Sequence, residues 1–365
     1  MKAIAYNPNC FVNAQGNDWT RYRSLFKLIG FGVSFVDRTG CIKTPVDTIT
    51  LPEFAIPEYD ANFNLNYNDC CLTRARELAT LQERIDCPIR IMYSGGIDSS
   101  LILSSFIQSI GLSNSAKRIE IVMNYDSVHE NPWMWEKFIR PNFKVINSDL
   151  HGSFWNQDYI LVGGEGNDQL LGTDIYMDIV AKYGDGILDK MYTEDLIRDY
   201  FVRRGLTETE QDLWIGLFRE QSKHCPTPIN TIAEYWWWIN FSCKWASVYH
   251  RMMFYVQDSS NISSKYLSMY YQQFFNTNYF QQWSLKDRDH KHQGNYITYK
   301  FHARELIADF MSAPGYLKKI KYPSLSNVTK FKYACDLIDS NYKLQYKIEP
   351  LDWYNPDNSF NKLLS

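Results

Sequence analysis

The chain has 365 residues, with 38 Lys or Arg against 41 Asp or Glu and a formal net charge of −3. At roughly 150 residues per domain, this length predicts about two domains, or one large domain with an appendage. The balanced charge excludes a general basic surface for nucleic acid or anionic membranes, although it leaves room for a local basic patch. Aromatic residues make up 16% of the chain, which argues against disorder.

No apolar run approaches the roughly 18 residues of a membrane span. No apolar stretch of signal-peptide type follows Met1–Cys10. We therefore expect a cytoplasmic protein without membrane association. The eight cysteines form no Cys-x-x-Cys pair, so we expect reduced thiols rather than disulfides or a tetrathiolate zinc site.

Residues 1–67 mix short apolar stretches with Asn, Gly and Pro, and we expect a small α+β extension there. Asn68-Asp69 can cap a helix that carries leucines and alanine at three-residue spacing. Pro88 predicts that this helix ends near Asp86.

From Ile89 onward, apolar runs typical of strands buried on both faces alternate with helical stretches. The predicted strands are 89–93, 119–125, 144–146 and 159–162. This alternation predicts an α/β fold with a doubly wound parallel sheet, whose ligands bind at the carboxyl ends of the strands. The predicted helices beyond the first are 99–110, 175–182, 193–203, 207–220, 231–255 and 299–310. We expect residues 1–67 as an extension, 68–330 as the main domain with helical C-terminal additions, and 331–365 as a tail packed on it.

The segment Ile91–Ser100 is the most informative in the chain. A buried strand runs into Gly95-Gly96, and a helix follows. Glycines let the backbone approach an anion closely, and the free N–H groups of a helix start point at it. The hydroxyls that could add donors are those of Ser94, Ser99 and Ser100.

Asp98 stands inside this predicted phosphate cradle, where it would repel an anion unless a divalent cation lay between them. It is therefore a candidate Mg²⁺ ligand. The loop has no Lys, so it is not the P-loop of enzymes that transfer the γ-phosphate.

The run Ser94–Ser99 resembles the SGGxDS motif of the ATP pyrophosphatase (PP-loop) superfamily, whose members cleave ATP between the α- and β-phosphates. A second segment, Gly163–Gly172, resembles the SGEGxDExxGG segment of the asparagine synthetase family, including its spacing from the first motif. Gly163, Gln169 and Thr173 depart from that pattern, which weakens the inference to asparagine as the product.

The resemblance implies an adenine nucleotide alpha hydrolase-like fold and an ATP-dependent ligase that adenylates a carboxylate and releases pyrophosphate. It implies that Asp98 and Asp168 hold Mg²⁺ on the pyrophosphate and that Glu165 is the general base toward an attacking amine. Gly163 and Gly164 belong to the nucleotide loop. The adenine is expected against the ends of the first two strands, at Met92 and at Val122 or Met123.

In this family an N-terminal glutaminase domain supplies the ammonia, but residue 2 is Lys and the segment before the first strand is too short for such a domain. We therefore expect free ammonia or an amine as nucleophile. The family also supplies a Lys late in the chain, which offsets charge on the phosphoryl oxygens. Lys321 is the first candidate and Lys319 the second, with Lys300 and Lys244 as weaker ones.

The segment 231–255 holds three consecutive indoles, Trp236, Trp237 and Trp238. Because all three cannot share one helix face, we expect some of them to line a pocket or an interface, or else to pack between lobes. The segment Phe280–Ser284 resembles stand-alone asparagine synthase-like proteins carried by bacteriophages, for which the compartment would be the host cytoplasm. We read His290-Lys291-His292 as a solvated loop rather than a zinc site.

Three functions stay open at this point. The first is the amide-forming ligase, with a small carboxylate and an amine or ammonia as partners. The second is a nucleobase-modifying PP-loop enzyme acting on DNA or tRNA, although the charge gives no indication of nucleic acid. The third is a nucleotide-binding regulatory protein without catalysis. The sequence leaves the oligomeric state unknown.

Overall fold

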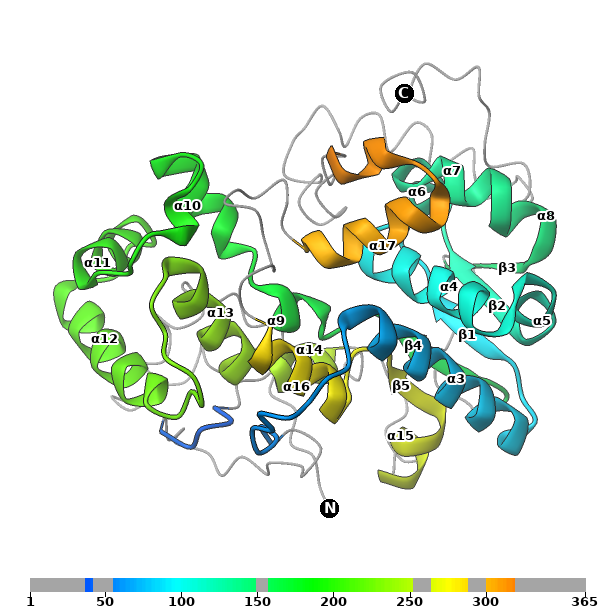
Figure 1. Ribbon diagram of the computed structural model, residues 1–365, viewed down its shortest axis with the longest axis horizontal. Helices are drawn as coiled ribbons and strands as arrows, with labels where there is room; N and C mark the ends of the chain where they lie inside the picture. The colour runs from blue at the N-terminus through cyan, green and yellow to red at the C-terminus, as the bar shows by residue number, and fades with distance from the viewer. Residues whose placement is uncertain (1–36, 42–54, 149–156, 252–263, 288–299, 319–365) are drawn as a thin grey trace, which may run out of the picture. The chain divides into compact units, whose positions relative to one another are not determined.

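The computed structural model describes residues 37–41, 55–148, 157–251, 264–287 and 300–318 (Figure 1). The chain divides into two compact units, each assembled from three segments. The sheet unit comprises Cys71–Gly164, Lys265–Gln272 and Ala303–Ser365, and the helical unit comprises Met1–Cys70, Glu165–Ser264 and Gln273–His302. The predicted domains 1–67, 68–330 and 331–365 stay a prediction, because most of the first and all of the last lie outside the described residues.

A five-stranded sheet in the order β3-β2-β1-β4-β5 forms the centre of the sheet unit. β1 pairs in parallel with both β2 and β4, and β2 pairs in parallel with β3. The predicted α/β class with a parallel sheet is confirmed. β2 and β4 are buried along their whole length, as their unbroken apolar runs predict. The strands are β1 Ile89–Met92, β2 Ile119–Met123, β3 Lys144–Asn147, β4 Ile160–Gly163 and β5 Tyr271–Gln273.

The predicted helices at the start of this region are confirmed with small shifts. α3 spans Tyr67–Ile85, and α4 spans Ile97–Ile110, so α4 begins two residues before the predicted start. The sequence missed the short helices between β2 and β3 because each is too short to show a period. The others of this unit are α5 Leu112–Arg118, α6 Tyr125–Glu130, α7 Pro132–Met134, the π-helix Trp135–Ile139, α8 Arg140–Asn142, α15 Ser264–Tyr270 and α17 Phe301–Met311.

The helical unit packs around a core of apolar and aromatic side chains. Thr193 caps α11, and Thr207 and Thr231 form capping boxes at α12 and α13, which explains why these three helices begin where the sequence predicts. The predicted helix 231–255 is divided at Lys244 into α13 and α14. The helices are α9 Asn167–Leu171, α10 Ile175–Tyr183, α11 Glu194–Arg203, α12 Glu208–Ser222, α13 Ile232–Cys243, α14 Trp245–Arg251 and α16 Asn278–Lys286.

The three consecutive indoles of α13 are all buried. Trp236, Trp237 and Trp238 have relative exposures of 0%, 1% and 0%. This burial contradicts the expectation that some of them line a pocket or an interface, and it agrees with the alternative that they pack inside the protein. Every residue of α13 except Glu234 is buried, and a helix that is apolar all round is surrounded by protein on every side.

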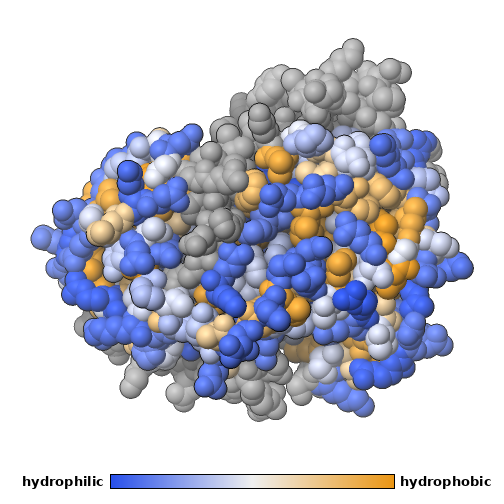
Figure 2. All heavy atoms as spheres, viewed as in Figure 1, coloured by the Kyte–Doolittle hydropathy of each residue, from blue (hydrophilic) through white to orange (hydrophobic). Residues whose placement is uncertain are grey.

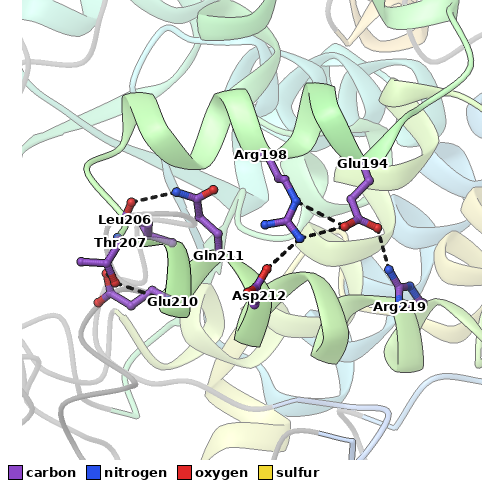
Figure 3. A network of polar contacts seen from close by, with 8 residues as sticks. All are labelled: Glu194, Arg198, Leu206, Thr207, Glu210, Gln211, Asp212 and Arg219. Carbon is purple, nitrogen blue, oxygen red and sulfur yellow. Dashed lines mark hydrogen bonds and ion pairs between the residues drawn. The ribbon is translucent and has the colours of Figure 1, made fainter.

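Charged residues join α11 and α12 on the outer side of this core. Arg198 on α11 pairs with Glu194 and with Asp212, and Arg219 on α12 also pairs with Glu194 (Figure 3). These side chains are between 32% and 62% exposed. Exposed pairs contribute little to stability, so the apolar core holds these helices together.

Hydrophilic residues cover most of the described surface in the face shown, with apolar residues scattered among them (Figure 2). None of the helices in the described ranges combines the length and the apolar character that a membrane span requires.

Candidate functional site

The two glycine motifs leave the carboxyl ends of neighbouring strands. The first follows β1 at Ser94, and the second begins at Gly163, the last residue of β4, which pairs directly with β1. Strand order runs from β1 toward β2 and β3 on one side, and toward β4 and β5 on the other. The chain leaves β1 toward one side of the sheet and β4 toward the other, so the carboxyl ends of these two strands form a topological switch point. Ligands of open α/β sheets bind at such a point.

The motifs touch one another within the sheet unit. A Cβ atom on Gly164 would lie 3.1 Å from the Cβ of Asp98 and 3.4 Å from Cδ1 of Ile102. Gly164 thus packs against the first turn of α4, where only a residue without a side chain leaves Asp98 undisturbed.

Gly95 adopts a backbone conformation that other residues avoid, with φ of +74°. A Cβ there would meet the backbone oxygen of Ser127 at 2.3 Å and the Cβ of Glu130 at 2.8 Å. The loop after β1 is therefore held between α4 and α6. Both the strained angle and the close approach require glycine.

Serine hydroxyls brace the loop from inside. The Ser99 hydroxyl donates to the backbone oxygen of Gly96 at 3.2 Å, and it accepts the backbone N–H of Ser94 at 3.2 Å. The Ser94 hydroxyl accepts the backbone N–H of Gly96 at 3.3 Å. Ser94 is exposed, whereas Ser99 is 3% exposed, so these two serines differ in their access to a ligand.

Ser100 is the centre of a buried polar network. Its hydroxyl donates to the backbone oxygen of Gly95 at 3.2 Å, accepts from the Asn131 side-chain amide at 3.2 Å, and lies 3.3 Å from the Tyr93 hydroxyl. Burial raises the pKa of Tyr93, which keeps this phenol protonated. The one proton of the Ser100 hydroxyl is used on Gly95, so Ser100 shapes the loop, and its predicted role as a phosphate donor stays a prediction.

The predicted adenine residues lie at the ends of β1 and β2. Met92 is half-buried, and Met123 is 1% exposed. Val122 pairs with Met92 in register, and its backbone oxygen accepts the N–H of Tyr93 at 2.8 Å. The side chain of Met123 belongs to the core, which leaves backbone groups as its means of contact with a base.

Glu165 and Asp168 belong to the helical unit, whereas Asp98 belongs to the sheet unit. In its own unit, the segment from Glu165 is anchored by hydrogen bonds from several elements. The Gln273 side chain accepts the Glu165 N–H at 3.0 Å, and the Tyr67 hydroxyl donates to the Asn167 side chain at 2.5 Å.

The second half of this segment is anchored to α13 and α16. The Asn240 side-chain amide donates to the backbone oxygens of Asp168 and Gly172, at 3.3 Å and 2.5 Å. The Ser284 hydroxyl donates to the backbone oxygen of Leu170 at 2.6 Å. Neither partner can be predicted from the sequence, because Asn240 and Ser284 lie 72 and 114 residues away from Asp168 and Leu170 in the chain.

Asp168 has an ammonium partner within the helical unit. The Nζ atom of Lys300 lies 2.8 Å from Oδ1 of Asp168. Lys300 is 0% exposed, and its backbone has a φ of +60°, which is uncommon outside glycine. The structure therefore places Lys300, one of the weaker lysine candidates, directly on a predicted site carboxylate.

The other predicted cations are placed differently. The Nζ atom of Lys244 lies 3.8 Å from Oδ1 of Asp174, which is not one of the predicted site carboxylates. Lys319 and Lys321 fall outside the described residues, as do His290, Lys291 and His292.

No group of three or more His, Cys, Asp or Glu side chains within the described ranges is placed to hold a metal ion. Asp98 is half-buried at the loop and is the kind of hard oxygen ligand that Mg²⁺ takes. Asp168 fits a metal less well, because Oδ1 already faces a buried ammonium. The shared magnesium site of Asp98 and Asp168 stays a prediction, and no chemical step is derived through it.

Comparisons with protein-family models, with curated proteins and with solved structures found no match to this chain.

Proposed function

We propose that this protein is an ATP-dependent ligase that adenylates a carboxylate, releases pyrophosphate, and transfers the acyl group to ammonia or an amine. The observation that supports this most is the meeting of two glycine motifs at the carboxyl ends of β1 and β4, with Gly164 packed against Asp98. A nucleotide phosphate fits a loop that only glycine can form, at the start of a 14-residue helix.

The fold proposed for the sheet unit is the doubly wound, adenine nucleotide alpha hydrolase-like one. The strand order β3-β2-β1-β4-β5 and the parallel pairs support it. The resemblance of Ser94–Ser99 and Gly163–Gly172 to the family motifs supports the same choice.

In the proposed first reaction, a carboxylate oxygen of the substrate attacks the α-phosphorus of ATP. The bond from this phosphorus to the bridging oxygen of pyrophosphate breaks, and an acyl-adenylate forms. The N–H group of Gly95 would bind a phosphate oxygen, and the Gly96 N–H would do so by exchanging its bond to the Ser94 hydroxyl, as donors aimed at developing negative charge. Asp98 would hold Mg²⁺, which when bound neutralises charge on the pyrophosphate.

In the proposed second reaction, the amine nitrogen attacks the acyl carbon, the bond to AMP breaks, and the nitrogen loses a proton. Glu165 is the proposed acceptor of that proton. Its backbone is fixed through Gln273, and its side chain is half-buried. This role rests on the resemblance of the second motif to the asparagine synthetase segment.

The test is exchange of radiolabelled pyrophosphate into ATP, screened over amino acids and other small carboxylates. We expect exchange that depends on one carboxylate and is lost in Asp98→Asn. Asp86→Asn is the matched control, since Asp86 is exposed and its φ of +58° suits asparagine. Tight ATP binding without exchange for any carboxylate would favour the regulatory function instead, and absence of ATP binding would exclude both.

A further inference from the structure

The peptide group between Gly95 and Gly96 has one buried side and one exposed side. Its carbonyl oxygen, that of Gly95, accepts the buried Ser100 hydroxyl at 3.2 Å. The described part of the chain has no cis peptide bond, and the C=O and N–H groups of a planar trans peptide point in opposite directions. The Gly96 N–H therefore points away from Ser100, to the side where the hydroxyl of the exposed Ser94 accepts it at 3.3 Å. One buried hydroxyl thus decides which way a candidate phosphate donor points.

Asn131 determines the direction of this hydroxyl. Its side chain is buried, with 2% exposure of the residue, and its Nδ2 atom donates to the Ser100 hydroxyl oxygen at 3.2 Å. An amide nitrogen can only donate, so the Ser100 oxygen accepts here and its own proton must turn to another acceptor. The Gly95 oxygen takes that proton.

The orientation of the Asn131 amide is itself fixed. Asn131 is the N-cap of α7, and its Oδ1 atom accepts the backbone N–H of Met134 at 3.2 Å. An amide turned by half a rotation would set its NH2 group against that N–H, and the cap would be lost. The cap therefore holds the donor end of the side chain toward Ser100.

A main-chain contact joins Asn131 to the same loop from a second side. The Asn131 N–H donates to the backbone oxygen of Ser127 at 3.4 Å, and a Cβ on Gly95 would meet this same oxygen at 2.3 Å. All of these residues belong to the segment Cys71–Gly164 of the sheet unit. Asn131 thus contacts both groups that confine Gly95, the Ser100 hydroxyl and the Ser127 oxygen.

We propose that Asn131 is a positioning residue for phosphate binding. By donating to Ser100, it holds the Gly95 carbonyl inward and so presents the Gly96 N–H to a nucleotide phosphate. A phosphate oxygen would replace the Ser94 hydroxyl as the acceptor, because a charged acceptor forms the stronger bond. The inference rests on the proposed nucleotide function and adds to it a residue that the sequence did not single out.

The test asks whether Asn131 acts through Ser100. Asn131→Ser keeps a side-chain oxygen for the cap of α7 but is too short to reach Ser100, and Ser100→Ala removes the hydroxyl that Asn131 orients. Titration calorimetry with Mg²⁺ and ATP measures the ATP dissociation constant of the wild type, both single variants and the double variant. We expect each single variant to raise this constant about threefold to tenfold, the worth of one hydrogen bond. The double variant should bind ATP no more weakly than Ser100→Ala does.

Two results would overturn the proposal. If the two losses of affinity multiplied in the double variant, the effect of Asn131 would not depend on Ser100 and would be that of a helix cap alone. An unchanged ATP affinity in Asn131→Ser would also overturn it. Asn142→Ser is the matched control and should bind ATP like the wild type, since Asn142 is exposed and donates to the backbone oxygen of Phe138 at 2.9 Å.

Should Asn131→Ser fail to fold, Asn131→Asp takes its place in the same comparison. The carboxylate keeps the size and the cap, but it accepts the Ser100 proton, so the Gly95 oxygen loses its donor. Because its charge weakens ATP binding with or without Ser100, the expected result is a larger loss of affinity when Ser100 is present than in Ser100→Ala. Equal losses would overturn the proposal.

The same measurements separate this inference from the proposed function. A wild-type chain that does not bind ATP would refute the proposed function and this inference with it. A wild-type chain that binds ATP, with independent effects of Asn131 and Ser100, would refute this inference alone.

Discussion

At the residue scale, a few positions allow only one kind of side chain. Gly95 has a positive φ and a backbone oxygen 2.3 Å from where its Cβ would be. Gly111, at the end of α4, also has a positive φ, of +82°, but a Cβ there would meet nothing within 4 Å. A side chain at Gly111 would therefore cause backbone strain alone, whereas a side chain at Gly95 would cause both backbone strain and a steric clash.

We predict that Gly111→Ala lowers the free energy of unfolding by about 1–3 kcal/mol, as strained backbone does, without affecting ATP binding. Gly95→Ala should lower the free energy of unfolding further, because the Ser127 oxygen must also move. This variant should also fail to bind ATP. Urea unfolding and ATP titration of both variants check this. A Gly95→Ala variant that unfolds like Gly111→Ala and keeps ATP binding would show that the loop tolerates a side chain.

The Asp168–Lys300 pair is asymmetric, because Lys300 is 0% exposed and the Asp168 side chain is 45% exposed. Asp168→Asn leaves the buried ammonium without this carboxylate. We expect this substitution to lower the free energy of unfolding by about 3 kcal/mol. Lys300→Met replaces the buried charge by an apolar chain of similar length and leaves a carboxylate that water can reach. Lys300→Met should therefore lower the free energy of unfolding by clearly less than Asp168→Asn does.

Urea unfolding of the two single variants and of the double variant measures both costs and their coupling. If Lys300→Met were as destabilising as Asp168→Asn, the asymmetry of burial would not govern the pair.

At the element scale, register brings three charged residues of three strands into one row. Arg90 of β1 pairs with Glu120 of β2, and Glu120 pairs with Lys144 of β3. Both cations bond the Glu120 carboxylate, at 2.7 Å and 2.6 Å. The guanidinium of Arg90 also lies over the ring of Tyr159, 3.8 Å from its centroid.

This row predicts a pH dependence. Burial raises the pKa of Glu120, but the hydrogen bonds from Lys144 and Arg90 more than offset it, so the pKa is lowered from 4.5 in the folded state. The carboxylate therefore stabilises the fold above about pH 4.5, and this contribution is lost as the pH falls through the folded-state pKa.

We expect Glu120→Gln to be less stable than wild type near pH 7, with the difference shrinking toward about pH 3, in urea unfolding at both values. Glu136→Gln, which removes an exposed pair with Arg140, should follow the wild-type curve. A difference between Glu120→Gln and wild type that stays constant with pH would contradict the role of the row.

At the scale of the whole molecule, neither unit is one continuous stretch of chain. The sheet unit takes Cys71–Gly164 together with Lys265–Gln272 and the chain from Ala303 onward. The later segments supply β5, the Phe310 ring that packs on Phe138, and Tyr316 against Ser100.

We therefore predict that a fragment of residues 71–164 does not unfold cooperatively, although it holds β1 to β4 and the glycine loop. Without β5 one side of β4 has no strand partner, and without α17 an apolar surface is exposed to water. Circular dichroism during urea unfolding, with the full chain as the reference, checks this. A sharp, reversible transition of the fragment would show that the later segments are dispensable.

Much of the fold could be predicted because its signals are local. The strands β1, β2 and β4 are short apolar runs, α4 follows two glycines, and α11 to α13 begin at capping threonines. The sequence did not predict β5, since its three residues carry no period. Nor did it predict α6 to α8, because short helices depend on tertiary contacts.

The candidate site also has one part that the sequence predicts and another part that depends on the tertiary structure. The sequence alone determined the glycine loop after β1, the second motif after β4 and the carboxylates they carry, because glycine and carboxylate at those spacings have a local chemical meaning. Only the tertiary structure decided that Lys300 pairs with Asp168, that Asn131 bonds Ser100 behind the loop, and that the three indoles of α13 are buried. These contacts join residues far apart in the chain, and which distant side chains meet is decided by packing in three dimensions.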